Sequence, residues 1–286
     1  MRNSISGKTS LLALIGDPVE HSLSPVMQNA AFQVLGLDYV YVTFRVKQGD
    51  VEKAVAGIRA MNMRGLNVTM PHKVTVMPLL DNIDPMAEKI GAVNTIVNND
   101  GKLTGYNTDA TGFLQALAEK SVEPAGQKVV LLGAGGVARA IGFALAEEGA
   151  HLVILNRKEE VGWAKDLATR IGQSYGVPVA FGEMDRDTVG DALENADIVV
   201  NATSVGMSPG AGQTPVEKEF ICSKMVVFDA VYNPVQTRLL REAREQKAKA
   251  IDGLDMLVYQ GAAAFEKWTG QAAPVDVMRQ SALKAL

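Results

Sequence analysis

A glycine-rich segment near the middle of the chain has the residue types and spacing that hold the pyrophosphate of a dinucleotide. Residues 129–140 read V-V-L-L-G-A-G-G-V-A-R-A and carry the pattern G-x-G-x-x-A. In this pattern the first glycine permits a tight turn, the second lets the backbone approach the pyrophosphate, and a small third residue allows close helix–strand packing. The following helix N-terminus supplies free N–H groups for the phosphates. Because the pattern follows a strand-like run and opens a helix-like one, it predicts a dinucleotide site at Gly133, Ala134, Gly135, Gly136, Val137 and Ala138.

The end of the next predicted strand indicates which dinucleotide is bound. An acidic residue about 20 positions after the glycine pattern holds the ribose 2′-hydroxyl of NAD, whereas an arginine accommodates the 2′-phosphate of NADP. Here the strand ends in L-N-R-K-E-E, with Asn156 at 156 − 133 = 23 residues after Gly133. Arg157 and Lys158 follow, so NADP is favoured over NAD. The two glutamates that come next weaken this charge argument, and Arg157 alone could be a solvated loop cation.

Several polar residues in the first part of the chain have both a structural and a chemical interpretation. Lys73 follows a proline in N-V-T-M-P-H-K, and that proline suits the first turn of a helix. A cation in a first turn is unfavourable by a few tenths to about 1 kcal/mol, so Lys73 is either simply solvated or kept there for chemistry. Asp109 and Ser24 could each cap the helix that follows, whereas Ser22 has no such role. Gln260 lies in an apolar helical run, where its amide is either structural or a contact for a ligand.

The elements that must position these residues alternate between strand and helix. In the first part, strand-like runs cover residues 11–15, 39–46, 65–69, 93–98 and 102–106, and helix-like runs cover residues 25–35, 50–61 and 111–120. After a break at residues 121–127, short apolar runs recur at residues 128–133, 151–156, 177–181, 197–201 and 225–230. Continuously apolar runs are typical of strands buried on both faces of a parallel sheet. The pattern predicts an α/β fold of two α/β units.

Composition excludes several other classes of protein. The chain has 286 residues, 47% of them hydrophobic, and a net charge of −4, whereas a nucleic-acid scaffold needs clustered positive charge. The basic run at residues 238–249 is interleaved with glutamates at helical spacing and is interpreted as a solvated helix face. The three histidines show no metal-ligand spacing, so no metal is expected. One cysteine, Cys222, and the lack of a long apolar run predict a cytoplasmic protein with no membrane segment.

Taken together, the polar motifs resemble the shikimate dehydrogenase family. The matching motifs are H-S-L-S-P, N-V-T-M-P-H-K, G-A-V-N-T, G-Y-N-T-D, G-A-G-G-V-A-R-A, N-A-T-S-V-G-M, V-Y-N-P and M-L-V-Y-Q-G-A. They occur in the family's order from residue 16 to about residue 265, so nearly the whole chain is covered. Chance could supply one such motif but hardly eight in order.

The resemblance implies a domain organisation that the alternation of elements could not show. A substrate-binding domain would comprise residues 1–108 and be completed by C-terminal helices at residues 251–286. A Rossmann-type NAD(P)-binding domain would comprise residues 109–250, with a cleft between the two domains.

The resemblance also implies the reaction, in which 3-dehydroshikimate is reversibly reduced to shikimate by hydride from a nicotinamide. Lys73 and Asp109 would form the catalytic pair, with the lysine donating the proton that the ketone oxygen needs. The residues implied to bind the substrate are Ser22 and Ser24 for its carboxylate, and Thr69, Lys73, Asn94, Asp109 and Gln260 for its ring hydroxyls or carbonyl. Tyr232 would line the cleft, Asn67 and Thr108 belong to the same motifs, and Thr203 and Gly253 would join the cofactor site.

Three alternatives to this interpretation remain open. The run N-R-K-E-E-V departs from the pattern of strictly NADP-dependent members and resembles the quinate/shikimate branch, which can use NAD and accept quinate. A non-catalytic sensor of shikimate-like ligands would share the fold, but the proton-transfer pair is retained here. A dehydrogenase of similar architecture that acts on amino acids or folates would leave the serine pair unexplained. The chain is expected to work as a monomer or a homodimer.

Overall fold

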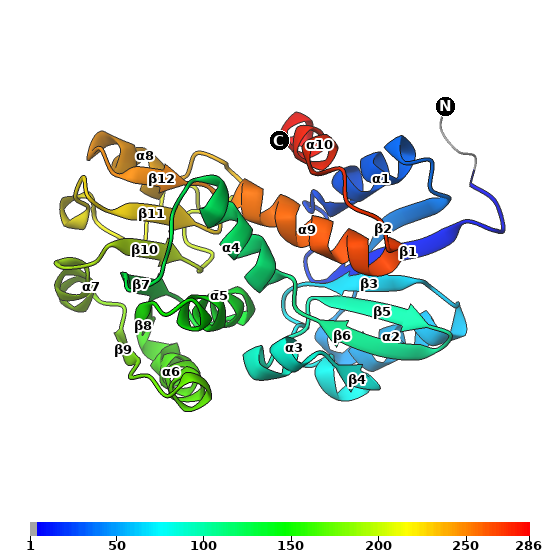
Figure 1. The fold of residues 1–286 in the computed structure, drawn as a ribbon, viewed down its shortest axis with the longest axis horizontal. Coiled ribbons are helices and arrows are strands. Elements are labelled where there is room, and N and C mark those ends of the chain that lie inside the picture. The colour runs from blue at the N-terminus through cyan, green and yellow to red at the C-terminus, as the bar shows by residue number, and fades with distance from the viewer. Residues whose placement is uncertain (1–4) are drawn as a thin grey trace. The chain divides into compact units, whose positions relative to one another are not determined.

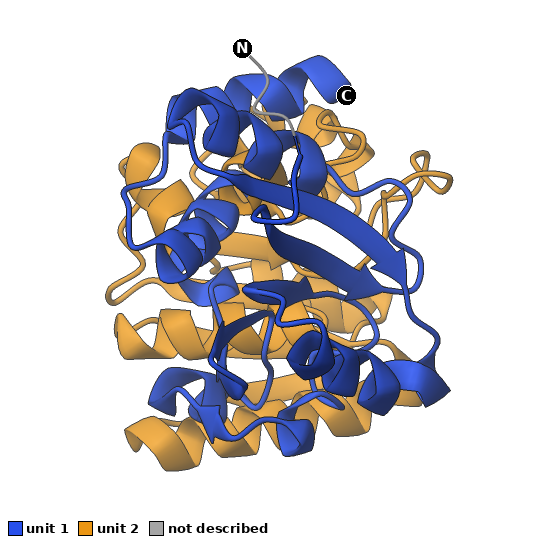
Figure 2. Ribbon diagram, turned by 90° about the vertical axis from the view of Figure 1, so that its right-hand side faces the viewer, with its two compact units in different colours: residues 1–112, 258–286 blue, residues 113–257 orange. Residues whose placement is uncertain are grey.

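The computed structural model describes residues 5–286, and the chain divides into two compact units. The first unit contains residues 1–112 and 258–286, and the second contains residues 113–257 (Figure 2). The boundaries fall within two helices, α4 (Asp109–Glu119) and α9 (Gly253–Thr269). The resemblance placed the domain ends at residues 108 and 250, so the compact units end slightly later along the chain.

The first unit is built on a six-stranded mixed sheet (Figure 1). The strands are β1 (Ser10–Gly16), β2 (Tyr39–Arg45), β3 (Gly65–Val68), β4 (Asn82–Ile83), β5 (Thr95–Asn99) and β6 (Lys102–Tyr106), in the order β2-β1-β3-β5-β6-β4. Strand β1 runs parallel to both β2 and β3, whereas β5 is antiparallel to β3 and to β6. The helices are α1 (Ser24–Val34), α2 (Val51–Ala60), α3 (Pro85–Ile90), the first residues of α4, most of α9, and α10 (Val275–Ala285).

Local sequence explains most of these elements. Val55 and Ile58 of α2 are buried in one core with Leu66 and Val68 of β3, as expected for an amphipathic helix on a sheet. The hairpin between β5 and β6 turns through Asp100 and Gly101, whose φ values of 52° and 87° are both positive. Two successive residues with positive φ make a type I′ turn, which matches the twist of a hairpin. The predicted hairpin is therefore confirmed.

The expectation that a helix begins at Pro71 is wrong. Residues 70–76 form turns, and only a single 3-10 turn at Met77–Leu79 follows. The carbonyl of Lys73 accepts a hydrogen bond from the amide of Val93 at 2.7 Å, which ties this segment to the residue before Asn94 instead of to a helical ladder. A tertiary contact thus overrides the local helical signal, and Lys73 does not lie in a helix first turn.

The two predicted N-caps are also wrong. Helix α1 already includes Ser24, and it is the hydroxyl of Ser22 that accepts a hydrogen bond from the Ser24 amide at 3.2 Å. At α4 the side chain of Asn107 accepts from the Asp109 amide at 3.0 Å. In both cases the polar side chain two residues earlier makes the local hydrogen bond at the helix start, Ser22 at α1 and Asn107 at α4.

The second unit is a doubly wound α/β unit (Figure 1). Its strands are β7 (Lys128–Leu132), β8 (His151–Asn156), β9 (Ala180–Glu183), β10 (Ile198–Asn201), β11 (Val226–Asp229) and β12 (Lys249–Ile251). All neighbours pair in parallel in the order β12-β11-β10-β7-β8-β9, which is the Rossmann strand order. The helices within it are α5 (Gly136–Glu147), α6 (Val161–Tyr175), α7 (Arg186–Leu193) and α8 (Arg238–Glu245).

Burial in the second unit agrees with the sequence pattern. Strand β10 is buried along its whole length, as its continuously apolar run predicts. Helix α8 buries Leu239, Leu240 and Ala243, while Arg238 pairs with Glu242 one turn on at 2.7 Å. The interpretation of this basic run as a solvated helix face is therefore confirmed.

Candidate active site

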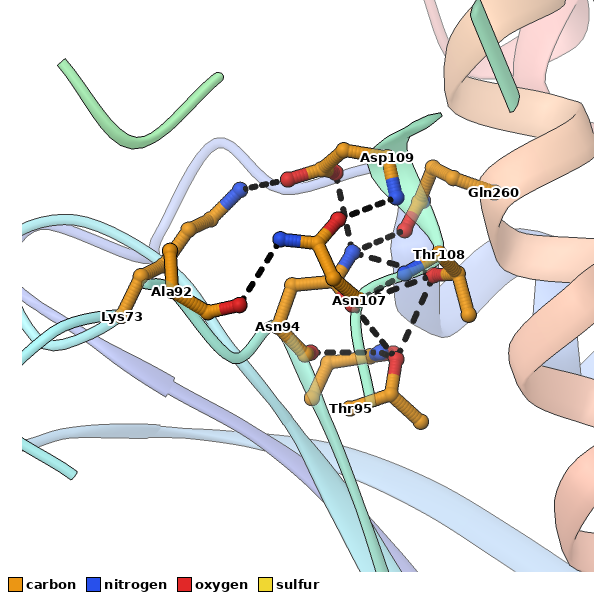
Figure 3. Close-up of polar contacts among 9 residues, drawn as sticks. Lys73, Ala92, Asn94, Thr95, Asn107, Thr108, Asp109 and Gln260 are labelled. Carbon is orange, nitrogen blue, oxygen red and sulfur yellow. Dashed lines mark hydrogen bonds and ion pairs between the residues drawn. The ribbon is translucent and has the colours of Figure 1, made fainter. Parts of the chain in front are cut away.

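Lys73 and Asp109 form a buried ion pair in the first unit (Figure 3). The lysine Nζ lies 2.5 Å from Oδ2 of Asp109, and the two residues are only 9% and 5% exposed. Asp109 is in the first turn of α4, where the helix dipole favours a carboxylate. A cation and an anion that share a hydrogen bond away from bulk water can exchange a proton with a bound molecule.

Asn94 fixes the second oxygen of the same carboxylate. Its Nδ2 donates to Oδ1 of Asp109 at 2.9 Å and to Oγ1 of Thr108 at 3.0 Å. Its Oδ1 accepts from the Thr108 amide at 2.8 Å, which locks the orientation of the amide. Gln260 of α9 lies at the edge of this cluster, 3.5 Å from Asn94 Nδ2 (Figure 3). The structure therefore brings Lys73, Asn94, Asp109 and Gln260 together.

Sheet topology explains why residues far apart in sequence meet here. Parallel strands β1 and β3 end at the same edge of the sheet, with Ile15 opposite Val68. The antiparallel strand β5 begins at that edge, where Thr95 faces both Asn67 and Tyr106, the last residue of β6. The residues that leave this edge are Ser22 and Ser24 after β1, Thr69 and Lys73 after β3, Asn94 before β5, and Thr108 and Asp109 after β6.

The serine pair and Thr69 lie at this edge but apart from the ion pair. Ser24 is 7% exposed, and both Ser22 and Thr69 are half-buried. Among the described residues none of the three hydrogen-bonds to the Lys73–Asp109 cluster; the Ser22 hydroxyl instead accepts from the Ser24 amide.

Asn107, which the sequence argument did not single out, completes the site. Its Oδ1 accepts from the Asp109 amide, and its Nδ2 donates to the Ala92 carbonyl at 2.9 Å (Figure 3). The side chain thus ties the start of α4 to the segment before Asn94. An asparagine two residues ahead of a predicted helix is a recognisable capping signal, so this role could have been found.

In the second unit, the predicted cofactor residues gather at the carboxyl edge of the parallel sheet. Gly133 follows β7 with φ of 104°, and an added Cβ would lie 3.1 Å from the Ala202 carbonyl oxygen, so only glycine fits there without strain. Gly135 is the N-cap of helix α5, and nothing lies within 4 Å of a Cβ added to it. This open backbone at a helix N-terminus fits a pyrophosphate. The residues at the same edge are Gly133 to Ala138 after β7, Asn156 to Lys158 at β8, Thr203 after β10, Tyr232 after β11 and Gly253 after β12.

The end of β8 carries an ion pair that bears on cofactor choice. The guanidinium of Arg157 hydrogen-bonds the Glu160 carboxylate, which raises the pKa of the arginine, and both lie in the segment N-R-K-E-E. Asn156 donates from its side chain to the Glu160 carbonyl at 3.0 Å. The carboxylate of Glu160 therefore already pairs with Arg157, the cation that would meet a 2′-phosphate.

A buried carboxylate that the sequence argument also missed belongs to Asp229, the last residue of β11, opposite Asn201 of β10. Asp229 is fully buried and accepts from Asn201 Nδ2 at 2.9 Å, from the Val231 amide at 3.0 Å and from Thr237 Oγ1 at 2.7 Å. Burial raises its pKa to about 6 despite these hydrogen bonds. Asn201 in turn accepts from Thr203 Oγ1 at 2.6 Å, so Asp229 helps to hold the loop that bears a predicted cofactor residue.

Two absences among the described residues bear on metals and membranes. Residues 5–286 contain no group of three His, Cys, Asp or Glu side chains able to hold a metal ion. Over the same range, no helix is both long enough and apolar enough to cross a bilayer.

A Rossmann-order nucleotide unit, joined to a unit that carries a buried Lys–Asp pair, defines a class of two-unit α/β dinucleotide-binding proteins. Residues 14–96 match the model of the shikimate dehydrogenase substrate binding domain, residues 116–249 that of shikimate / quinate 5-dehydrogenase, and residues 253–283 that of the shikimate 5′-dehydrogenase C-terminal domain. The chain belongs to the shikimate dehydrogenase family.

Individual relatives are similar to this chain along nearly its full length and theirs. The shikimate dehydrogenase (NADP⁺) of Moorella thermoacetica is 49% identical over 281 residues, covering 96% of this chain and 92% of that protein. A crystal structure of a shikimate dehydrogenase in complex with NADP⁺ is 43% identical with a TM-score of 0.93, covering 99% of this chain and 98% of that one. The enzyme from Listeria monocytogenes, solved with shikimate and NAD, is 41% identical with a TM-score of 0.91, covering 98% of each chain.

Proposed function

We propose that the protein is an NADP-dependent shikimate dehydrogenase that reversibly reduces 3-dehydroshikimate to shikimate, a step in chorismate and aromatic amino acid biosynthesis. The observation that carries the proposal is the buried ion pair of Lys73 and Asp109, because a ketone reduction needs a proton donor at the developing alkoxide. The relatives named above support the substrate and the cofactor.

The reaction assigns Lys73 and Asp109 the catalytic roles. When bound, the nicotinamide supplies a hydride to the carbonyl carbon of 3-dehydroshikimate. The Lys73 ammonium group donates a proton to the carbonyl oxygen as negative charge develops there, and the C=O bond becomes the C–OH of shikimate. Asp109 orients the ammonium group through the 2.5 Å hydrogen bond and stabilises its charge. In the reverse direction the neutral lysine accepts the hydroxyl proton.

The other polar residues are assigned to substrate binding. Ser22 and Ser24 bind the carboxylate, and their position beside the first turn of α1 provides the donors that an anion needs. Thr69, Asn94, Asp109 and Gln260 bind the ring hydroxyls or the carbonyl. Tyr232 is assigned to the substrate on the family resemblance, and burial raises its pKa, so its phenol stays protonated as a donor.

The residues of the second unit fit a dinucleotide. The backbone from Gly133 to Ala138 would cradle the pyrophosphate, Asn156, Arg157 and Lys158 would meet the 2′-phosphate, and Thr203 and Gly253 would flank the nicotinamide half. On this assignment residues 1–108 with 251–286 bind the substrate and residues 109–250 bind NADP. We place the protein in the cytoplasm as a monomer or homodimer, and its single cysteine suits a reducing compartment.

A second candidate, a quinate/shikimate dehydrogenase that also uses NAD, is favoured by one observation. Glu160 already pairs with Arg157, which lowers the positive charge offered to a 2′-phosphate.

Four reactions test the two candidates, namely shikimate or quinate with NADP or NAD, compared by kcat/KM. Turnover confined to shikimate with NADP supports the first candidate, and comparable turnover with NAD or quinate supports the second. No turnover in any of the four by folded protein would refute both and favour a ligand sensor.

A further inference from the structure

The polar cluster around Asp109 continues into the interior of the first unit through Asn67. This residue, on β3 and 5% exposed, donates from its Nδ2 to the Asn94 carbonyl at 3.1 Å and to Thr95 Oγ1 at 3.0 Å. Thr95 Oγ1 donates to Oδ1 of Asn94 at 3.0 Å. Asn94 is therefore held from behind as well as by the residues at the start of α4.

The far end of this chain of hydrogen bonds is a buried phenol. Tyr41 of β2 is 1% exposed, and its hydroxyl donates to Oδ1 of Asn67 at 2.7 Å. Strand β1 lies between β2 and β3, so the side chain reaches across a neighbouring strand to make this bond. Because Asn67 Oδ1 is held by the phenol, its Nδ2 must point toward Asn94 and Thr95.

Tyr41 is also tied to the first turn of α1. Asn29 accepts from the Tyr41 amide at 2.9 Å and donates to the Tyr41 carbonyl at 2.8 Å. The same Nδ2 donates to the Pro25 carbonyl at 2.8 Å, next to Ser24. Burial raises the pKa of Tyr41, and the hydroxyl of Ser24 opposes that rise through a hydrogen bond. The turn that carries Ser24 is thus fixed to the residue that orients Asn67.

Packing alone does not require a hydroxyl at this position. The Tyr41 ring lies against Trp268, with ring centroids 6.0 Å apart, and a phenylalanine would fill the same space. Burial of a hydroxyl group is unfavourable unless hydrogen bonds compensate it. Here the partners are Asn67, which hydrogen-bonds Asn94 of the site, and Ser24.

We propose that Tyr41 is a positioning residue for the reaction, which orients Asp109 through Asn67 and Asn94 and links this carboxylate to the turn that carries the serine pair. The proposal rests on the proposed function. On this proposal, binding of a carboxylate at Ser22 and Ser24 is energetically coupled to proton transfer at Lys73. A substrate with a carboxylate is therefore turned over faster than its direct contacts with the serines alone would explain.

Tyr41→Phe tests the positioning role. We expect kcat with shikimate and NADP to fall about tenfold, which corresponds to about 1.4 kcal/mol, while KM for NADP stays unchanged. Tyr39→Phe is the matched control, because Tyr39 is on the same strand and stacks on Phe32 with centroids 5.2 Å apart. Its kinetics should equal those of the unsubstituted protein. A folded Tyr41→Phe protein with normal kcat would overturn the proposal.

A second variant breaks the same chain at another link. Thr95→Val keeps the shape of the side chain but removes the hydroxyl between Asn67 and Asn94, so it should reproduce the kcat loss without changing KM for NADP. If Tyr41→Phe does not fold, this variant decides, and normal kcat in it overturns the proposal.

The coupling is measured by combining Tyr41→Phe with Ser22→Ala, because Ser22 makes no hydrogen bond to Tyr41 among the described residues. We expect the loss of kcat/KM from Ser22→Ala to be at least threefold smaller in the Tyr41→Phe background. Additive effects would overturn the coupling. Inactivity of the unsubstituted protein toward shikimate would instead refute the proposed function, so the two failures are distinguishable.

Discussion

Both oxygens of the Asp109 carboxylate are engaged by different side chains, Oδ2 by Lys73 at 2.5 Å and Oδ1 by Asn94 at 2.9 Å. The carboxylate therefore cannot rotate without breaking a charged hydrogen bond or a neutral one. This geometry makes the ion pair a fixed unit.

Replacing Lys73 should separate catalysis from binding. In Lys73→Ala we expect kcat to fall by about 10²- to 10⁴-fold, the usual loss for a general acid, while KM for shikimate changes only a few-fold. Steady-state kinetics measure both values, and a normal kcat would contradict the assignment.

The same substitution leaves the Asp109 carboxylate buried without its cation. Breaking a buried pair in this way costs about 3–5 kcal/mol. The double variant Lys73→Ala, Asp109→Asn should regain part of this stability in urea unfolding while it stays inactive. A double variant no more stable than Lys73→Ala would argue against an uncompensated charge.

Two glycines of the same loop should respond differently to alanine. Gly133 has φ of 104° and a crowded Cβ position, so Gly133→Ala should lower the stability by about 1–3 kcal/mol and weaken NADP binding. Gly135 has φ of −74° and free space, so Gly135→Ala should fold with normal stability but bind NADP more weakly, because a methyl group stands where the pyrophosphate approaches. Thermal unfolding and titration with NADP compare them. Unchanged NADP affinity in Gly135→Ala would place the pyrophosphate elsewhere.

Glu160 should limit the preference for NADP over NAD. Glu160→Gln frees Arg157 from its ion pair, so the ratio of Kd for NAD to Kd for NADP should rise about two- to fivefold, as expected for an exposed ion pair. Glu159→Gln is the control, since within residues 5–286 the Arg157 side chain hydrogen-bonds Glu160 and not Glu159, and it should change the ratio less. Equal effects of the two variants would show that Glu160 acts only through its negative charge and not through its ion pair with Arg157.

Asp229 should make the stability of the protein depend on pH. The folded state raises the pKa of this carboxyl from 3.8 to about 6, so it holds its proton more tightly than the unfolded chain does. The contribution of Asp229 to the free energy of unfolding is then fully present below about pH 4. It falls as the pH rises through 6, by about 3 kcal/mol in total.

Asp229→Asn removes this titration. The free energy of unfolding of the variant minus that of the unsubstituted protein should therefore increase between pH 4 and pH 7 in denaturant titrations. Asp276→Asn, at an exposed carboxylate, is the control and should leave the difference flat. A flat difference for Asp229→Asn as well would show that its pKa is not raised.

Four Rossmann strands, β7, β8, β10 and β11, could be predicted from the sequence because each is a short and mostly buried apolar run. The run predicted at residues 177–181 is displaced, since β9 covers Ala180–Glu183 and no residue of it is fully buried. Strands β4 and β12, of two and three residues, were not predicted, since such short segments carry no periodicity. The prediction of a helix after Pro71 was wrong, and the Lys73 carbonyl instead accepts from Val93, a partner 20 residues away in sequence that no local rule identifies.

The candidate site shows the same division between local and tertiary information. The types and motifs of Lys73, Asn94 and Asp109 singled them out, but their hydrogen bonds depend on the pairing of β3, β5 and β6. Asp229 was missed because an aspartate at a strand end reads as an ordinary loop residue. Only the fold shows that this aspartate is buried.

The first unit is built from two separate segments of the chain, and this determines when it can fold during synthesis. The second unit is one continuous segment, residues 113–257, and can fold as soon as it leaves the ribosome. The first unit must wait for residues 258–286, which bring Gln260 to the site, Trp268 to the carbonyl of Ile96, and α10 to the surface of α1. Until then the apolar face of α1 lacks the cover of α10, and the polar cluster around Asp109 lacks Gln260, so the first unit exposes apolar surface while the second can already be folded.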